Sequence, residues 1–205
     1  WNQMIQNSDF NNWGGGPKLT FSVDHVFNPK NALSVSTSIN TNWRSTLTDW
    51  DTKIGKKDST LSFLWAQNAD RFSTTLGYDF NIDYRRKFDK KDREFGWSAQ
   101  VSKNVDNSDY TSIRKNQNLS AYRTEKSLNV GENLEISTQL DLTEPITKKL
   151  SLEAGLKGIM RFVVSDYHFD TLNYVSQEYF TLDNRNNTFN YYQNVGAGYL
   201  QFNYV

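Results

Sequence analysis

Strict alternation of apolar and polar side chains over residues 72–88 constrains the fold of this chain more than any other feature. Seven of the nine even positions in this segment carry Phe, Leu, Ile or Tyr, and no odd position carries a large apolar residue. Side chains of a β-strand point alternately to its two faces, whereas a helix repeats about every 3.6 residues. The segment is therefore predicted to form one extended strand with an apolar face and a polar face.

The same alternation recurs along most of the chain. It is clear in residues 19–27, 33–43, 95–105, 134–146 and 150–164. Residues 60–70 are predicted to form a further strand or part of a loop. Residues 188–205 alternate less cleanly, because their apolar residues change parity, which predicts a β-bulge or a register ambiguity. We expect about seven antiparallel strands.

Short turns are predicted at one end of the strands and long loops at the other. In the turns, Asn, Asp or Pro supplies the turn geometry, and each turn contains Lys. The turns are Phe27–Asn31, Phe88–Asp92 and Pro145–Lys149. The predicted loops are the polar segments 49–59, 106–131 and 165–187. This asymmetry is typical of barrels that cross an outer membrane.

Strand length separates such a barrel from a soluble β-sandwich, which alternates in the same way. Soluble strands average about 5–6 residues, whereas strands that cross a bilayer need about 9–11. The longest run here is seventeen residues. We therefore predict an all-β fold, an antiparallel transmembrane β-barrel built as a meander of long hairpins.

Composition agrees with a membrane barrel and excludes several other classes of protein. Only 37% of residues are hydrophobic but 15% are aromatic, and aromatic girdles mark the two membrane interfaces of barrels. The predicted girdle residues are Phe27, Trp43, Tyr84, Phe88, Trp97 and Phe162. The absence of Cys rules out disulfide scaffolds and thiol catalysis, and no apolar run is long enough for a transmembrane helix. The formal net charge is zero, so no nucleic-acid partner is expected.

Two histidines are the candidates for side-chain chemistry. His25 falls on the apolar parity near a turn, which indicates an interfacial side chain. His168 lies within Asp166–Asp170, in a predicted loop, where an Asp–His hydrolytic pair or a metal ion is imaginable. No second ligand type follows at a fixed spacing. We therefore predict no enzyme activity and no catalytic, cofactor-binding or metal site.

Three further segments have a structural interpretation beside a functional one. Asp49–Asp51 and Asp183–Asn187 offer oxygen ligands for a hard cation, but Asp and Asn are also turn formers in exposed loops, and we favour the second interpretation. Gly14–Gly16 precedes neither a helix signal nor a Lys-Ser/Thr pair. It is therefore interpreted as a flexible loop and not as a phosphate-binding loop.

Three stretches carry a resemblance to a known family: Phe27–Ser36, Tyr84–Asp92 and Leu142–Lys157. The third is the most specific, because a strand is followed by a Pro-apolar-polar-Lys-Lys turn and then by Leu-x-Leu-Glu-x-Gly-Leu-Lys. Phe189–Tyr199 also resembles the next strand of that family. In these patterns the chain resembles the outer-membrane β-barrel family of Bacteroidetes, attached in many members to a TonB-dependent plug.

The resemblance implies that residues 1–205 form one barrel segment in the outer membrane, without a plug domain or a TonB-binding segment among them. Outer-membrane transporters of this type have about twenty-two strands. Residues 202–205 resemble a mid-barrel strand, so we expect the chain to be part of a larger barrel. It opens at Trp1 without an initiator Met, which indicates a mature or trimmed form.

The resemblance also implies a function. A TonB-dependent receptor-like transporter takes up a scarce nutrient, with extracellular loops that capture it, a plug domain and the TonB energy-coupling system as partners, and outer-membrane lipid around the barrel. The alternative is a non-transporting structural or interaction barrel that holds surface lipoproteins or secretion partners. In the first case the polar parity forms a hydrated wall around the plug. Its predicted members are Ser73, Asp79, Asn81, Asp83, Gln100, Glu135, Gln139, Glu153 and Lys157.

Overall fold

The computed structural model describes residues 2–56 and 62–204, which form a single β-sheet. Its elements are β1 (Asn2–Gly15), β2 (Lys18–Asn28), β3 (Asn31–Lys56), β4 (Ser62–Lys87), β5 (Glu94–Lys115), β6 (Ala121–Pro145), β7 (Leu150–Asn173), β8 (Glu178–Thr181), the short 3-10 helix η1 (Asp183–Arg185) and β9 (Asn187–Tyr204). Every strand pairing is antiparallel. No helix among these residues is long and apolar enough to cross a membrane. The prediction of an all-β antiparallel meander is confirmed.

Strands β1 and β2 together form one span of the sheet. β1 pairs with the upper half of β3 and β2 with its lower half, and the register is the same from Asn2↔Lys56 to Val26↔Ala32. The chain crosses Gly16 and Pro17 between them without changing that register. A Cβ at Gly16 would lie 1.8 Å from the carbonyl oxygen of Thr41, so only glycine fits there. The interpretation of Gly14–Gly16 as a flexible loop is therefore wrong.

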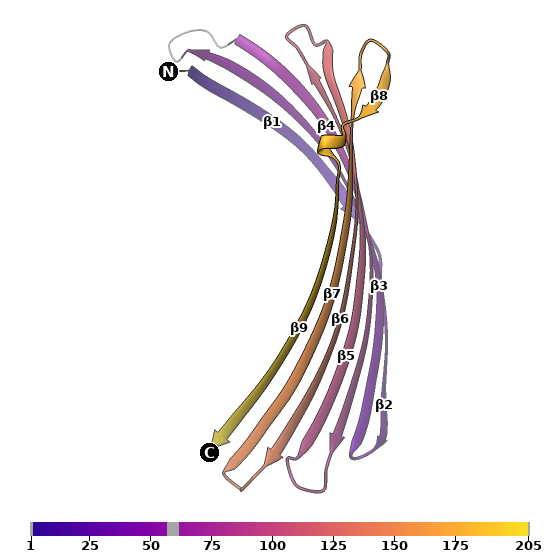
Figure 1. Ribbon diagram of the computed structural model, residues 1–205, viewed down its shortest axis with the longest axis vertical. Helices are drawn as coiled ribbons and strands as arrows, with labels where there is room; N and C mark the ends of the chain where they lie inside the picture. Colours follow the sequence, from indigo (N-terminus) through magenta and orange to yellow (C-terminus); the bar gives the residue numbers. More distant parts are fainter. Residues whose placement is uncertain (1, 57–61, 205) are drawn as a thin grey trace.

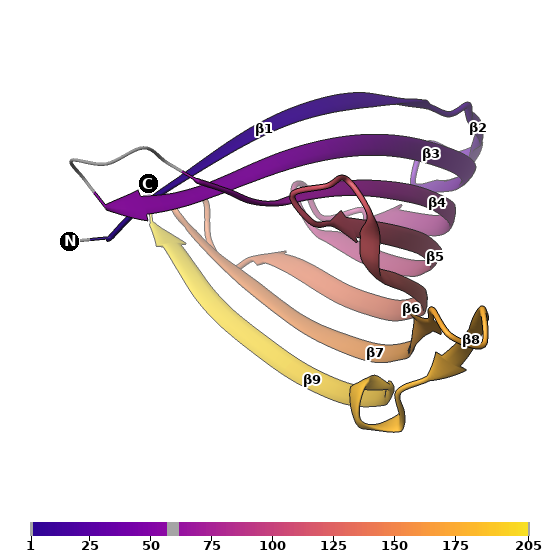
Figure 2. The ribbon, with the colours of Figure 1, turned by 90° about the horizontal axis from the view of Figure 1, so that it is seen from above.

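The sheet is an open arc. Figure 1 shows it bowed along the strands, and Figure 2 shows it curled across them, with β1 and β2 along one edge and β9 along the other. Among the described residues, no pairing joins these two edges. The short turns 29–30, 88–93 and 146–149 lie at the lower end in Figure 1, as predicted, and Asp92 adopts the left-handed conformation that Asp tolerates in turns.

No second layer covers the sheet. Among the described residues only Ala69 and Phe169 are buried hydrophobic side chains, whereas many large ones are exposed. Tyr78 and Phe80, which alternate within the longest apolar run, are each 42% exposed. A soluble β-sandwich buries its apolar face between two sheets. That alternative is excluded for the described residues.

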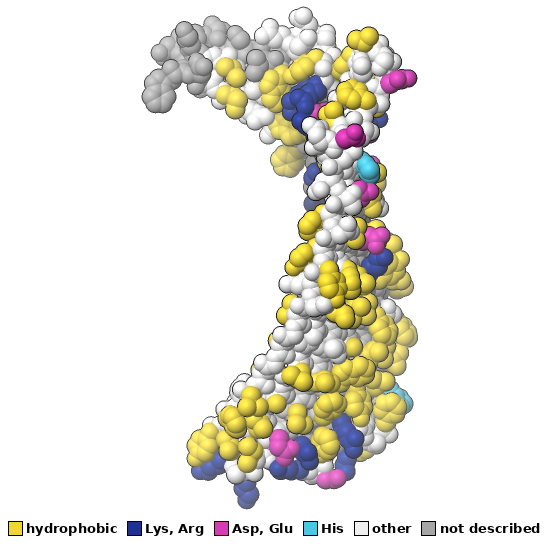
Figure 3. Space-filling model, viewed as in Figure 1, with side chains coloured by type: hydrophobic (Ala, Val, Ile, Leu, Met, Phe, Trp, Pro, Cys, Tyr) yellow, Lys and Arg dark blue, Asp and Glu magenta, His cyan; other side chains and the backbone are white. Residues whose placement is uncertain are grey.

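The two faces differ as the alternation predicts. In the pairing register, Leu33, Tyr84, Trp97, Leu140 and Leu156 form one row across the sheet and therefore share a face. This is the convex face, and Figure 3 shows hydrophobic side chains gathered along its lower part. The nine residues predicted for the polar wall all lie on the opposite, concave face.

The prediction of long loops over residues 49–59, 106–131 and 165–187 is wrong. β3 continues to Lys56 and β5 continues to Lys115. β6 already begins at Ala121, and β7 continues to Asn173. Ser62–Asp70 is the first part of β4, and residues 57–61 lie outside the described residues. Alternation disappears in the upper part because both faces carry polar residues there, while the backbone ladder continues without it. Apolar and polar residues alternate only where the two faces of a strand meet different environments, so a strand with two polar faces shows no alternation.

The predicted irregularity in the last strand is also wrong. β9 pairs with β7 in one unbroken register from Asn187 to Tyr204. The change of parity means that apolar residues occupy both faces of this strand. Leu200 and Phe202 lie on the convex face, whereas Val195 and Tyr199 lie on the concave one.

Candidate functional site

The convex face carries an apolar band that runs obliquely across the sheet. On β3 the apolar positions extend from Leu33 to Trp43, and on β7 they extend from Leu150 to Val164. Leu33 shares its row with Leu156, so the band begins six residues lower on β7 than on β3. Strands of membrane barrels are tilted by about 35–45° to the bilayer normal. A band parallel to the membrane then crosses the hydrogen-bonded rows at an angle, as it does here.

Aromatic and charged side chains mark the edges of this band. Tyr84 and Trp97 are cross-strand neighbours at its lower edge. At its upper edge Phe162 packs against Tyr192, with ring centroids 4.8 Å apart. The predicted girdle residues Trp43 and Phe162 therefore lie at an edge of the band, but far from the strand ends, because the strands continue above it.

An ion pair lies on the convex face where the band ends on β5 and β6. Lys103 Nζ and Glu132 Oε2 are 3.0 Å apart, and both side chains are about half exposed. A charge at the middle of a bilayer costs about 2–4 kcal/mol in a barrel, and much less at the interface. The pair therefore fits the level of the outer lipid headgroups.

The lower turns are linked to one another by charge. Lys30, in the turn before β3, donates a hydrogen bond to Asp89, in the turn before β5. This hydrogen bond, and then the positive charge of Lys30, hold the pKa of Asp89 below its ordinary value. Lys90 pairs with Glu144 across the next pair of strands at 2.6 Å. These contacts join neighbouring hairpins at the lower rim.

The concave face carries paired polar groups along its whole height. Arg161 donates two hydrogen bonds to Glu135 on the neighbouring strand, one of them at 2.9 Å. Tyr199 lies across Gly155 and donates to Asp141 two strands away at 2.7 Å. A Cβ at Gly155 would lie 2.2 Å from the Tyr199 ring, so glycine makes room for this contact. Such a polar inner surface is typical of the interior of a large barrel.

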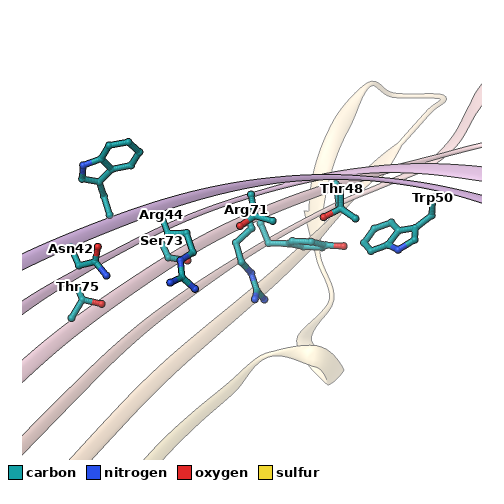
Figure 4. Close-up of a pocket in the computed structure, with 11 residues that line it drawn as sticks. Asn42, Arg44, Thr48, Trp50, Arg71, Ser73 and Thr75 are labelled. Carbon is teal, nitrogen blue, oxygen red and sulfur yellow. The ribbon is translucent and has the colours of Figure 1, made fainter. Parts of the chain in front are cut away.

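A hollow of about 630 Å³ opens on the concave face over β3, β4 and β5, and we refer to it as the upper hollow (Figure 4). It lies level with the upper edge of the apolar band on β3 and above it. The lining residues of concave parity are Asn42, Arg44, Thr46, Thr48, Trp50, Ala69, Arg71, Ser73, Thr75 and Tyr110; Trp43 also borders the hollow, although its parity is that of the convex face. Figure 4 shows Arg44 and Arg71 extending to the same side of the sheet. Two cations and two aromatic side chains thus meet in one concave, polar site.

The histidines form no such site. His25 lies on the convex face near the lower turn, where its ring meets the edge of Phe27 with centroids 4.5 Å apart. His168 lies in β7 and not in a loop, and its Nε2 is 3.1 Å from Asp166 Oδ2. Both partners of that pair are about half exposed on the convex face. Thr188 donates to the same carboxylate at 3.0 Å, but not to the imidazole.

The oxygen-rich segments have structural roles. Asp49 and Asp51 lie in β3 on the convex face and are not turn residues, and Trp50 between them faces the upper hollow. Within 183–187, Asn186 accepts a hydrogen bond from the backbone of Phe169 at 2.8 Å. In the described part of the chain, no three His, Asp or Glu side chains gather where a metal ion could be held.

The sequence did not indicate Arg44, Arg71 or Tyr110 as site residues. They are 27 and 39 residues apart along the chain (44 to 71, and 71 to 110) and meet only through the strand register. The available signal was weak: both arginines fall on the polar parity of strands whose other polar residues at this level are mostly uncharged.

Distant likenesses to solved structures include an uptake receptor and a translocator domain. The ferric yersiniabactin uptake receptor FyuA from Yersinia pestis shares 9% identity, with 97% of this chain and 43% of that chain covered and a TM-score of 0.23. The translocator domain of autotransporter NalP from Neisseria meningitidis shares 11% identity, with 97% and 87% covered and a TM-score of 0.12. At such TM-scores neither likeness informs fold or function. This chain spans less than half the length of the FyuA chain. No curated protein matches the sequence.

The family comparison is more informative. The model of the outer membrane protein beta-barrel family matches residues 86–205, which is more than half of the chain. The matched part includes β5, β6, β7 and β9, with two of the three short turns. Together with the oblique apolar band and the polar concave face, this match confirms the predicted barrel fold and outer-membrane location. The chain belongs to the outer membrane protein beta-barrel family, whose members lie in the lipid of the outer membrane.

Proposed function

We propose that this chain is part of the barrel wall of a TonB-dependent receptor-like transporter, which takes up a scarce nutrient through the outer membrane. The observation that supports the proposal is the upper hollow, a concave polar site on the inner face of the sheet, at and above the upper edge of the apolar band. A receptor needs a binding site at this level, open to the outside and facing the import path. The proposal includes no catalytic step, cofactor or resident metal.

The curvature of the sheet supports a wide lumen. The nine strands make seven spans, because β1 and β2 share one and β8 is a short hairpin strand above β7. A barrel of about eight strands is closed and filled by its own side chains. Here seven spans form an open arc (Figure 2). In lipid both edges require partner strands, so the proposed barrel is larger and has room for a plug domain.

The experiment compares the parent bacterium with a strain that lacks the gene for this chain. Cells are grown with iron, a vitamin or the carbon source made limiting, and uptake of the limiting nutrient is measured with a labelled probe. We expect one uptake rate to fall at least tenfold in the deletion strain and to recover with the wild-type gene. A protonophore should abolish that uptake in the parent, because TonB coupling uses the proton gradient.

The result that contradicts transport is equal uptake in both strains under every limitation. Loss of surface lipoproteins from the deletion strain, with uptake unchanged, would instead indicate the structural or interaction barrel. A ligand that still enters after protonophore treatment would indicate a passive pore.

A further inference from the structure

The strongest unexplained feature of the concave face is a pair of arginines in the upper hollow. Arg44 of β3 lies opposite Ser73, and Arg71 of β4 lies opposite Thr46, so the two arginines occupy diagonal positions on one face. Diagonal neighbours in an antiparallel pair are about 7–8 Å apart, and like charges at close cross-strand positions are destabilising. An anion held between them would remove this repulsion.

No carboxylate lines the upper hollow. The nearest acids on the concave face by register are Asp106, which accepts a hydrogen bond from Thr75 at 2.5 Å, and Glu125, which is paired with Arg123. Arg71 lies over the ring of Tyr110, with its guanidinium carbon 5.8 Å from the ring centroid. Among the described side chains, no ion pair involves Arg44 or Arg71.

Other arginines at this end of the sheet do have partners. Arg114 donates to Gln67 at 2.9 Å and lies over the ring of Trp65, and Arg123 pairs with Glu125. The guanidinium groups in the upper hollow are therefore a distinct pair and not simply part of a uniformly cationic rim.

Charge is also distributed unevenly between the two faces of this region. Asp49, Asp70 and Asp109 occupy convex positions at the level of the upper hollow, whereas Arg44 and Arg71 occupy concave ones. The concave side is thus the positive side of the sheet at this height. A solute approaching from the lumen meets two guanidinium groups first, which favours an anion.

Aromatic side chains and a small floor residue give the upper hollow its shape. Trp50 and Tyr110 line it, and Figure 4 shows Trp50 beyond Arg71 along the strand. Ala69 lies between them in the register and also lines the hollow, where its small, mostly buried side chain forms part of the floor. Flat aromatic surfaces beside arginines favour a planar group that stacks while its charge is paired.

We propose that the upper hollow binds a planar organic anion, with a carboxylate between Arg44 and Arg71 and a ring system against Trp50 and Tyr110. Arginine suits this role because its planar fork donates two parallel hydrogen bonds to a carboxylate. The hydroxyl groups of Thr48 and Ser73 surround the site with further polar contacts. This inference deepens the proposed function, because it names the class of ligand that the receptor captures.

The test measures binding to the full-length protein purified in detergent, by isothermal titration calorimetry. The probes are 2-naphthoate, its neutral counterpart 2-naphthamide, and acetate. We expect 2-naphthoate to bind at least tenfold more tightly than either of the others, because only it offers both the charge and the ring. Equal binding of naphthoate and naphthamide, or of naphthoate and acetate, would overturn the proposal.

Three variants locate the binding site. Arg44→Gln/Arg71→Gln should weaken 2-naphthoate binding at least tenfold and leave 2-naphthamide binding unchanged. Ala69→Leu should weaken the binding of both naphthyl probes, because its side chain fills the floor. Ala66→Leu is the matched control, since Ala66 lies on the convex face of the same strand, and it should bind like the wild type.

A charge control separates a local site from the general field of the lumen. Lys157 lies on the concave face of β7, far across the sheet from the upper hollow. Lys157→Gln removes one positive charge and should leave the affinity for 2-naphthoate within twofold of the wild type. An equal loss in Lys157→Gln and in a single arginine variant would contradict the site. If 2-naphthoate binds as expected but the deletion strain shows no loss of nutrient uptake, this inference stands and the proposed transport function is contradicted. The two proposals can therefore fail separately.

Discussion

Replacing Ile82 by Arg tests whether the convex face contacts lipid. Ile82 lies on that face of β4, between Val35 and Ala99 on the neighbouring strands. The uninterrupted apolar positions on this face of β4 run from Leu76 to Tyr84, between Thr74 above and Arg86 below, so their midpoint is Phe80. Ile82 is thus two residues below the midpoint.

The expected cost follows from that depth. A strand rises about 3.3 Å per residue, and a tilt of about 40° reduces this to roughly 2.5 Å of height. Ile82 then lies about 5 Å from the centre of a band about 25 Å tall. Arg costs about 2–4 kcal/mol at the centre and about 0–1 at the edge. Ile82→Arg should therefore cost roughly 2 kcal/mol, or about a thirtyfold lower folding equilibrium constant, since about 1.4 kcal/mol is tenfold.

The control is the same change on the adjacent residue. Asn81 faces the concave side between Ser36 and Gln100, where it donates one long hydrogen bond of 3.4 Å to Ser36. Asn81→Arg should cost less than about 1 kcal/mol, because the new charge stays in water. Both variants are measured by urea titration in phosphocholine vesicles, followed by tryptophan fluorescence. Equal losses for the two substitutions would refute the assignment of the faces.

Two further predictions concern the strand pairing and the lower rim. Gly16→Ala should destabilise the pairing with β3 by about 1–3 kcal/mol in the same titration, because its Cβ meets the Thr41 carbonyl; Gly15→Ala, whose Cβ would meet nothing within 4 Å, should change stability by less than half as much, and the reverse order would contradict the close approach. Lys30→Gln should raise the pKa of Asp89 toward its ordinary value, as read from the carboxyl carbon shift by NMR, because the charged hydrogen bond is removed. In the wild type, the ion pair between Lys30 and Asp89 should be present at neutral pH and should be lost as the pH falls through the lowered pKa of Asp89. If the pKa of Asp89 does not change in the variant, Lys30 does not lower it.

The lower half of the sheet could be predicted from the sequence because two environments meet there. Lipid on one side and water on the other impose alternation, so residues 72–88 identify their own strand and face. Above the band both sides are polar, and the same backbone ladder leaves no periodic signal. Residues 106–115 therefore look like loop in the sequence but are strand in the structure.

The upper hollow could not be predicted because it depends on register between strands. Arg44 and Arg71 become neighbours only when β3 and β4 pair as they do, and a shift of one residue would place one arginine on the other face. The close approach of β3 to Gly16 could not be predicted either, because it also depends on which strands are neighbours. Nothing in a glycine run reveals that a neighbouring carbonyl occupies the space where a side chain would lie.

The length of the strands has a consequence for how the protein meets its surroundings. β4 has 26 residues, and about half of them lie above Thr74, where the apolar band ends. At roughly 2.5 Å of height per residue, this part projects about 30 Å beyond the hydrocarbon. Headgroups account for only about 5–8 Å of that distance on each side. A solute, an antibody or a protease arriving from outside therefore reaches the rim of the protein well before it reaches the membrane surface.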